Sequence, residues 1–465
     1  MSTVMTAARA ARRELSAFDG RLVGPEDAGY DDARKVYNAM IDRRPAVIAR
    51  CTSPADVGQV IGFARAHDLP LAVRGGAHNG AGLGTVDDGV VLDLSPMRLV
   101  RVDPQARTVR VGGGCTWGDV DRATGEHGLA TPSGIISTTG VGGLTLGGGL
   151  GHLTRRFGLA IDNLLEADVV LASGECVRAS EDENADLFWA LRGGGGNFGV
   201  VTAFTFRLHE VGTVVAGPTL WPIEASAEVL AVYREFLPAA PRELGGFFAY
   251  LSVPPGPPFP EELHLRKVCG VVWCHLGGDE EAAAAAMAPM LDALPAPLLH
   301  GPQPMPHAML QSAFDGVYPP GQQWYWRADF VNEISDEAIA AHARFGPQMP
   351  TWQSTMHLYP IDGAAHDVAS YDTAWSYRDA KFASVFAGVD PDPANAGAIR
   401  DWTVEYFDAL HPYSAGGAYV NMMMDEGQDR VRASYRGNYE ALARIKAIYD
   451  PGNLFRVNQN IRPAA

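Results

Sequence analysis

The segment Arg74-Gly75-Gly76-Ala77-His78-Asn79 places a histidine in a glycine loop directly after the predicted strand 71–74. Glycine has no Cβ and adopts positive φ without strain, so its backbone amides can approach a ligand closely and donate to phosphate oxygens. Glycine is also concentrated in residues 112–114, 140–151 and 193–199. Any one of these segments could be a tight turn or a bulge in a twisted sheet. Together they favour a site for a long phosphorylated ligand.

Strands and helices alternate on both sides of this loop. Residues 46–50 predict a strand, Ser53 predicts a helix cap, and residues 57–67 predict the helix that follows. Further strands are predicted at 71–74, 90–94, 99–102 and 108–111, the last two as a hairpin. The alternation indicates a mixed α and β domain over about residues 45–208.

The middle of the chain has a different character. A proline-rich loop at 253–260 separates predicted strands at 247–251 and 268–274, and helices are predicted at 279–294 and 335–346. Aromatic residues gather there: Trp324, Tyr325, Trp326, Trp352, Tyr359, Trp375 and Tyr377. They favour a second domain with an aromatic pocket for a planar or apolar substrate, although such residues are also common in an ordinary core.

Composition excludes several classes of protein. The chain has 465 residues, enough for two or three domains, and a formal net charge of −17, which argues against nucleic-acid binding. The five cysteines lack the paired spacing of a metal site, so we expect reduced, mostly buried thiols and no metal. The longest uncharged stretch, 128–151, contains nine glycines and does not read as a membrane span. Residues 1–15 lack the apolar core of a secretory signal, and we expect a cytoplasmic protein.

One dinucleotide-binding pattern is misleading. Residues 194–199, Gly-Gly-Gly-Asn-Phe-Gly, match the spacing, but a predicted helix at 185–191 precedes them and a predicted strand at 200–208 follows. The Rossmann fingerprint needs the reverse order, so that a pyrophosphate meets the start of a helix. Phosphate-loop, zinc-protease and hydrolase-elbow motifs do not occur in the sequence.

Five ordered motifs resemble those of the berberine-bridge-enzyme-like flavoproteins of the vanillyl-alcohol-oxidase superfamily. They are residues 74–79, 140–151, 157–163, 193–199 and the ending Tyr-Asp-Pro-Gly-Asn-Leu-Phe-Arg-Val-Asn-Gln-Asn-Ile at 449–461. The resemblance implies an α+β fold with a bipartite PCMH-type FAD-binding domain and a substrate domain whose antiparallel β-sheet is flanked by helices. The expected segments are 1–211 for the FAD-binding domain, with its core at 45–208, 212–420 for the substrate domain, and 421–465 completing the FAD-binding domain.

The same resemblance implies FAD, attached through the His78 ring to the flavin 8α-methyl carbon. Relatives with two links place a cysteine where this chain has Ile136, which cannot form a thioether, so we expect a single covalent bond. Cys115 lies outside that position and is expected to be a buried thiol. The residues expected to bind the cofactor are Arg74, Gly75, Gly76, Ala77, His78, Asn79, Gly82, Gly134, Thr138, Thr139, Gly140, Gly142, Gly143, Gly147, Gly149, Leu150, Asn163, Gly199, Val200, Val201, Asn458 and Asn460.

For the reaction, the resemblance implies hydride transfer from an alcohol or amine carbon of a small molecule, in secondary metabolism. Thr139 lies where relatives admit or hinder dioxygen, and its volume favours an oxidase that uses O2 and forms H2O2. The alternatives are a non-catalytic flavin-binding protein, a sugar oxidase, or a dehydrogenase with another acceptor. The sequence does not indicate the oligomeric state.

The expected catalytic residues are tyrosines and one asparagine. The family's aromatic-Pro-His-Arg element is altered here to Trp-Ser-Tyr-Arg at 375–378, and Ser384 and Val385 stand where a Gln or Glu is usual. A base from the strand expected at 375–385 is therefore disfavoured, and Asn421 resembles a motif of the same sheet. Tyrosine can act as a base when its surroundings lower its pKa. The candidates are Tyr435, Tyr377, Tyr419 and Asn421, with a packed aromatic as the alternative role for Tyr435.

Overall fold

A computed structural model describes residues 3–465, so Met1 and Ser2 of the expected 1–211 segment lie outside the described residues. The first part of the chain forms a four-stranded sheet of order β1-β2-β4-β3, in which β2, β4 and β3 are parallel. The elements are α1 (Thr3–Glu14), β1 (Arg21–Val23), α2 (Tyr30–Ala33), β2 (Val47–Arg50), α3 (Pro54–Ala66), β3 (Leu71–Arg74) and β4 (Val90–Asp93). Ser53 caps α3 as predicted, since its hydroxyl accepts a hydrogen bond from the Asp56 backbone amide.

A five-stranded antiparallel sheet of order β5-β6-β10-β8-β9 follows. The elements are β5 (Val100–Asp103), β6 (Thr108–Gly112), α4 (Trp117–Gly125), β7 (Leu129–Ala130), α5 (Val141–Leu146), α6 (Thr154–Phe157), β8 (Leu164–Val170), β9 (Cys176–Ser180), α7 (Ala185–Leu191), β10 (Val200–Arg207) and β11 (His209–Glu210). The predicted hairpin is confirmed as β5 and β6. The 193–199 loop runs from helix α7 into strand β10, so the order that excluded a Rossmann site is also confirmed.

The middle of the chain forms an eight-stranded antiparallel sheet, ordered β15-β12-β14-β13-β18-β19-β17 with β16 beside β12. The elements are β12 (Thr213–Pro222), α8 (Ser226–Ala239), β13 (Leu244–Ser252), β14 (Lys267–Leu276), α9 (Glu280–Asp292), β15 (Leu299–His300), β16 (Gln303–Pro306), α10 (His307–Gln311), β17 (Gln323–Val331), α11 (Asp336–Phe345), β18 (Thr355–Pro360), β19 (Phe382–Asp390) and α12 (Ala396–Leu410). Side chains of α8, α9, α11 and α12 share an apolar core with one face of this sheet. The α+β class is confirmed.

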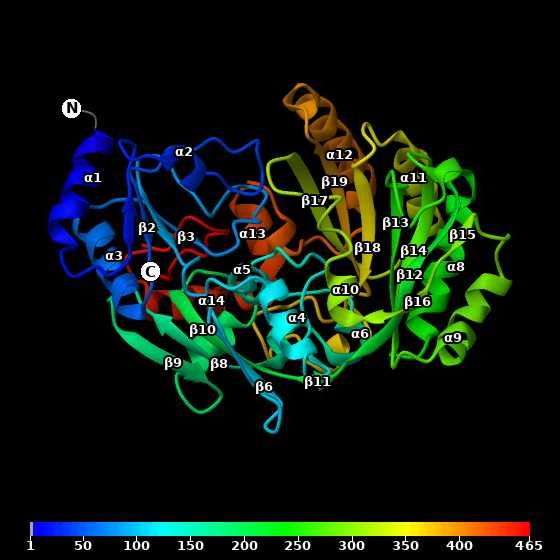
Figure 1. The fold of residues 1–465 in the computed structure, drawn as a ribbon, viewed down its shortest axis with the longest axis horizontal. Helices are drawn as coiled ribbons and strands as arrows, with labels where there is room; N and C mark the ends of the chain where they lie inside the picture. Colours follow the sequence, from blue (N-terminus) through cyan, green and yellow to red (C-terminus); the bar gives the residue numbers. More distant parts are fainter. Residues whose placement is uncertain (1–2) are drawn as a thin grey trace.

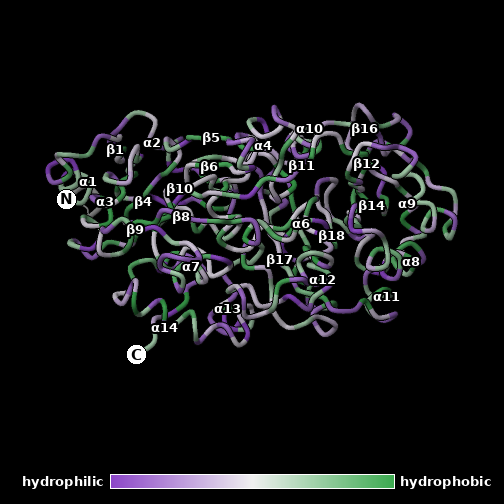
Figure 2. Tube along the Cα trace, turned by 90° about the horizontal axis from the view of Figure 1, so that it is seen from below, coloured by the Kyte–Doolittle hydropathy of each residue, from purple (hydrophilic) through white to green (hydrophobic). Residues whose placement is uncertain are grey.

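The last part of the chain returns to the half of the molecule that contains its first part. Helices α13 (Gln428–Tyr435) and α14 (Tyr439–Tyr449) lie in the same half of the molecule as α1 and α3, whereas α8, α9 and α11 gather at the opposite end (Figures 1 and 2). The buried Lys446 ammonium secures this return, because it pairs with Asp450 at 2.8 Å and donates to the Asn197 carbonyl at 2.6 Å. The tail thereby contacts the 193–199 glycine loop.

Two details differ from the predictions. The strand expected at 375–385 begins only at Phe382, because residues 375–381 form a turn in which Arg378 is bound by Asp162. Asn421 is not on the sheet and lies in the 3₁₀ turn Val420–Met422. Within residues 3–465 no helix is long and apolar enough to cross a membrane. All five cysteines are free, and only Cys176 is exposed.

Candidate active site between the glycine loops and the eight-stranded sheet

A cavity of about 340 Å³ lies where the three parts of the chain meet. One side, which we call the glycine wall, is formed by residues of the loops after β3, before α5 and before β10, together with the tail. The other side, which we call the sheet wall, is formed by Trp324, Trp326, Thr355, His357, Tyr359, Val385 and Ala387 of strands β17, β18 and β19. A volume of this size is ordinary for a ligand site.

The glycine wall is built by backbone in close contact. A Cβ on Gly76 would lie 2.4 Å from the Gly140 nitrogen, and a Cβ on Gly140 would lie 2.3 Å from the Gly76 nitrogen. Only glycine allows the two loops to approach this closely. Most residues expected to bind a cofactor line the cavity here: Arg74, Gly75, Gly76, Ala77, His78, Asn79, Gly134, Thr139, Gly140, Gly142, Gly143, Leu150, Gly199, Val200, Val201 and Asn458.

Six of the residues expected to bind the cofactor do not line the cavity: Gly82, Thr138, Gly147, Gly149, Asn163 and Asn460. Several of them support residues that do line it. The Thr138 hydroxyl lies 3.1 Å from His78 Nε2, and the Gly149 amide donates to the Tyr419 hydroxyl at 3.0 Å. Asn163 has a structural role, because its side-chain amide donates hydrogen bonds to the Phe157 and Leu159 carbonyls.

His78 is held firmly in the glycine wall. Its ring stacks on Tyr37 with centroids 3.9 Å apart, and the Thr139 hydroxyl lies 3.4 Å from Nδ1. Burial lowers the pKa of His78 to about 4, although a hydrogen bond to the Thr138 backbone opposes that effect. The imidazole is therefore neutral at neutral pH. The contact at Nδ1 is longer than the one at Nε2, which leaves Nδ1 the more weakly engaged nitrogen.

Tyr419 and Asn421 form one polar unit at the cavity. The Tyr419 hydroxyl oxygen accepts hydrogen bonds from the Gly149 amide at 3.0 Å and from Asn421 Nδ2 at 2.8 Å. Asn421 Nδ2 also donates to the Leu144 carbonyl at 3.0 Å, which fixes its orientation. Burial raises the pKa of Tyr419, and the donated hydrogen bonds act in the opposite direction by stabilising the phenolate.

The other two tyrosines differ from Tyr419. The Tyr435 hydroxyl is buried, lines the cavity and has no hydrogen-bond partner among the described residues, and burial raises its pKa. Tyr377 does not line the cavity. Its hydroxyl donates to the Ala433 carbonyl at 2.9 Å, and its ring stacks on Phe330 with centroids 4.3 Å apart. The structure therefore gives Tyr377 a packing position between β17 and α13.

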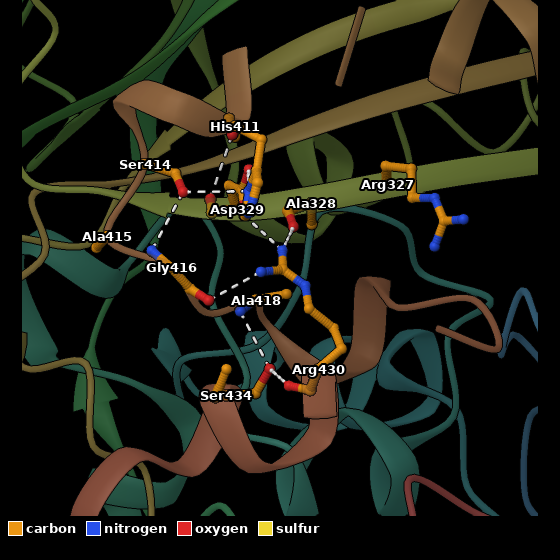
Figure 3. A network of polar contacts seen from close by, with 12 residues as sticks. Arg327, Ala328, Asp329, His411, Ser414, Ala415, Gly416, Ala418, Arg430 and Ser434 are labelled. Atoms are coloured by element: carbon orange, nitrogen blue, oxygen red, sulfur yellow. Dashed lines mark hydrogen bonds and ion pairs between the residues drawn. The ribbon is translucent and has the colours of Figure 1, made fainter. Parts of the chain in front are cut away.

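An ion-pair network holds the segment that carries Tyr419 against β17 (Figure 3). The buried Asp329 carboxylate of β17 pairs with Arg430 of α13 and lies 3.0 Å from His411 Nδ1. Arg430 also donates to the Gly416 carbonyl at 2.9 Å, close to Tyr419 in the chain. The Ser434 hydroxyl accepts from the Ala418 amide at 3.1 Å, so both ends of α13 restrain this segment.

The sheet wall contains functional candidates that sequence reasoning missed. Strand register places Trp326, Ala387 and Thr355 in one row across β17, β19 and β18, and His357 pairs with Val385 in the next row. Alternate residues of a strand share a face, so these side chains lie together. The sequence marks Trp324, Trp326 and Tyr359 as part of an aromatic group, but no signal in it marks Thr355 or His357.

The cavity fits a flavin nucleotide in two respects. The glycine wall is a backbone cradle that a Cβ would fill at Gly76 or Gly140. In addition, Asn458 Oδ1 and the Tyr435 hydroxyl are buried at the lining without partners among the described residues. Buried polar groups normally have partners, so these atoms indicate a missing ligand.

Comparison with known proteins agrees with this geometry. An FAD binding domain matches residues 45–180, and a berberine and berberine-like segment matches residues 418–462. An FAD-linked oxidoreductase of Dictyostelium discoideum is 31% identical over 436 residues, covering 93% of this chain and 92% of that protein.

Two solved structures are similar over the whole chain. 6-Hydroxy-D-nicotine oxidase of Arthrobacter nicotinovorans has a TM-score of 0.85 at 26% identity and covers 96% of this chain and 98% of its own. A glucooligosaccharide oxidase of Acremonium strictum, described with a 6-S-cysteinyl, 8α-N1-histidyl FAD, has a TM-score of 0.85 at 23% identity and covers 100% of both chains.

The two matched segments contain the glycine wall up to Leu150 and the tail with Tyr419, Tyr435 and Asn458. The relative from Dictyostelium extends the likeness through the sheet wall as well. The chain is an enzyme that uses FAD, and it belongs to the berberine-bridge-enzyme-like family of FAD-linked oxidoreductases.

Proposed function

We propose that this FAD-dependent oxidoreductase is an oxidase that carries its cofactor covalently through His78 alone. Its substrate is a small molecule that is oxidised at an alcohol or amine carbon, and its electron acceptor is O2, which is reduced to H2O2. The bound flavin supplies the hydride acceptor, a chemistry that no protein side chain provides. The protein's own part is to hold the cofactor, position the substrate and remove a proton.

The observation that carries the proposal is the position of His78, which lines the cavity within the glycine wall. A neutral imidazole keeps a free electron pair on one ring nitrogen, which is the group needed to form a bond to carbon, and burial keeps this ring neutral. Stacking on Tyr37 and the contacts with Thr138 and Thr139 limit the ring to one orientation. We expect Nδ1, the more weakly engaged nitrogen, to carry the bond.

A second link has no candidate thiol at the cavity. Ile136 lines the cavity and its side chain has no nucleophile, and no cysteine of the described residues is among the lining side chains. Cys115 is buried elsewhere, with its thiol 3.5 Å from the Leu99 carbonyl. These positions support a single covalent bond.

Tyr419 is the group best suited to take the proton from the substrate. Among the three candidate tyrosines, its hydroxyl lines the cavity and accepts two hydrogen bonds from N–H donors. Such donors stabilise the phenolate form, whereas Tyr435 has none and Tyr377 lies outside the lining. Asn421 acts as a positioning residue, since it orients the Tyr419 hydroxyl.

Use of O2 is supported by Thr139, which lines the cavity beside His78 and has a side chain no larger than valine. A small side chain there leaves room for dioxygen near the cofactor. The same wall would have to be more crowded in an enzyme that excludes O2.

The covalent bond is tested by precipitating the protein with acid. A yellow pellet and a colourless supernatant are expected from the wild type, and His78→Ala should release yellow flavin into the supernatant. His67→Ala, at an exposed histidine paired with Glu14, is the matched control and should keep a yellow pellet. Flavin in the wild-type supernatant would contradict the covalent bond.

The acceptor is tested separately. The flavin is reduced by light without oxygen, air is then admitted, and the return of flavin absorbance is followed together with H2O2. Rapid reoxidation with about one H2O2 per flavin supports the oxidase. Slow reoxidation without H2O2 would favour a dehydrogenase that uses another acceptor.

A further inference from the structure

His357 and Tyr359 form a buried polar pair on the cavity face of β18. His357 Nδ1 lies 2.6 Å from the Tyr359 hydroxyl, the two side chains are only 6% and 7% exposed, and both line the sheet wall. Thr355 of the same wall uses its hydroxyl to donate to the Tyr250 carbonyl at 2.8 Å, and the other neighbours are apolar or aromatic, with Val385 directly beside His357 across the strand pair. The pair is therefore a polar point in a mostly apolar surface.

The contact indicates which imidazole nitrogen carries a proton. Among the described residues, His357 is the recorded hydrogen-bond partner of the Tyr359 hydroxyl. If that hydroxyl donates to Nδ1, both atoms of this contact are satisfied and the ring keeps its proton on Nε2. The opposite arrangement leaves the buried hydroxyl proton of Tyr359 without an acceptor, which is unfavourable. His357 thus offers an N–H donor at Nε2.

The pair is uncharged, and so is the wall around it. Burial lowers the pKa of His357 to about 3 and raises the pKa of Tyr359, so both are neutral in the ordinary pH range. All residues that line the cavity are described. Arg74 is the only one of them that belongs to the charged types Lys, Arg, Asp and Glu. Its guanidinium belongs to the glycine wall, where it is bound by Asp93 at 2.7 Å and by the Ala33 carbonyl at 2.7 Å. A charged substrate would find no opposite charge on the sheet wall.

Flat aromatic surfaces complete this end of the cavity. Trp324 lies 5.3 Å from Tyr318 and 5.6 Å from Trp326 between ring centroids, and all three line the cavity. The indole nitrogens of Trp324 and Trp326 are buried without acceptors among the described residues. The wall therefore presents aromatic ring faces, which suit a planar, largely apolar molecule.

We infer that the sheet wall selects an uncharged aromatic alcohol, whose hydroxyl oxygen accepts a hydrogen bond from His357 as fixed by Tyr359. This inference rests on the proposed function, because it names the substrate class of the same site. It separates the enzyme from an oxidase of carboxylates or protonated amines. The sheet wall also disfavours free sugars, because many of their hydroxyls would lie against aromatic ring faces without hydrogen-bond partners.

The test measures binding to the oxidised holoenzyme from the rapid change in flavin absorbance that precedes any reduction of the flavin. Four probes share one ring: benzyl alcohol, toluene, benzoate and benzylammonium. At pH 7 benzyl alcohol should bind at least about tenfold more tightly than benzoate or benzylammonium, since burying an unpaired charge is costly. It should bind about fivefold more tightly than toluene, as one hydrogen bond predicts.

Two variants assign this preference to the pair. His357→Leu should weaken benzyl alcohol about fivefold and leave toluene unchanged, and Tyr359→Phe should weaken benzyl alcohol about twofold. The matched control is a second buried pair, His342 with Tyr406 at 2.8 Å, which lies away from the cavity. His342→Leu should leave the order of the four probes unchanged. If His357→Leu does not fold, Tyr359→Phe with Tyr406→Phe as its control decides the question.

Three outcomes overturn the inference: benzoate or benzylammonium binding as tightly as benzyl alcohol, failure of benzyl alcohol to bind, or equal losses for benzyl alcohol and toluene in the His357 or Tyr359 variant. These readings need neither turnover nor O2. A protein that fails to form H2O2 but keeps the predicted order of binding refutes the oxidase proposal alone. A protein that forms H2O2 with a charged substrate refutes the inference alone.

Discussion

The two walls of the cavity are built in different ways. The glycine wall presents backbone, and its shape depends on the absence of side chains at positions such as Gly76 and Gly140. The sheet wall presents side chains, and its character depends on which residues of β17, β18 and β19 face inward. One wall suits a ligand with a fixed structure, the nucleotide. The other can change with substrate while the strands stay in place.

This difference explains why family membership is easy to establish and substrate is not. A backbone wall tolerates few substitutions, so its glycines remain as a readable motif. A side-chain wall can exchange Val385 or His357 at modest cost to the fold.

Loss of the cofactor itself is expected from a change at the glycine wall. Gly76→Ala would place a Cβ 2.4 Å from the Gly140 nitrogen, and neither loop can move without disturbing the wall. We expect the flavin content of the purified protein to fall at least about tenfold, measured from the ratio of absorbance at 450 and 280 nm. Gly62→Ala is the control, because its Cβ would meet nothing within 4 Å in helix α3. Normal flavin content in Gly76→Ala would show that the wall is looser than the contacts indicate.

Between the walls, Tyr419→Phe should slow reduction of the flavin by substrate about 10³-fold while the bound flavin is retained, as expected for loss of a general base. Stopped-flow absorbance under nitrogen measures this rate. Tyr377→Phe, at a tyrosine outside the lining, should change the rate less than about threefold. If Tyr377→Phe slowed flavin reduction more than Tyr419→Phe did, the catalytic base would be Tyr377 and not Tyr419.

The tail joins the glycine wall through Lys446, whose side chain is fully buried. Lys446→Met leaves Asp450 and the Asn197 carbonyl without their charged partner, so the free energy of unfolding should fall by about 3 kcal/mol. Denaturant unfolding followed by flavin fluorescence measures it. Lys35→Met, at an exposed lysine paired with Asp32, should change it by less than about 0.5 kcal/mol. Equal losses would mean that the tail contact is dispensable.

The smallest effect is expected at the edge of the sheet wall. The neighbouring Asp329 carboxylate raises the pKa of His411 above 6.5, so protonated His411 is favoured in the folded protein. This stability is fully present below pH 6.5 and is lost as the pH rises through the folded pKa. Because His411 is partly exposed, the change should be under about 1 kcal/mol. The measurement compares the Tm of the wild type with that of His411→Gln between pH 5.5 and 8.5. Parallel plots of Tm against pH would show that His411 contributes no pH-dependent stability.

Local patterns allowed much of the glycine wall and its surroundings to be predicted from the sequence. Ser53 caps its helix, the 99–102 and 108–111 runs pair as a hairpin, and the loop after β3 lines a cavity with His78 in it. Each depends on a few neighbouring residues: a side chain that accepts from its own helix, an alternating strand pattern, or the freedom of glycine. Such features hold wherever the segment sits in the fold.

The tertiary structure alone decided which side chains meet. Tyr377, Tyr419 and Tyr435 are equivalent as residue types, and only the return of the tail and the Asp329 network put Tyr419 at the cavity with two donors. The register between β18 and β19 placed His357 beside Val385, and a slip of β18 by one residue would have turned His357 to the opposite face of the sheet. The sequence determined the backbone cradle because glycine acts locally. The substrate face required long-range pairing between strands.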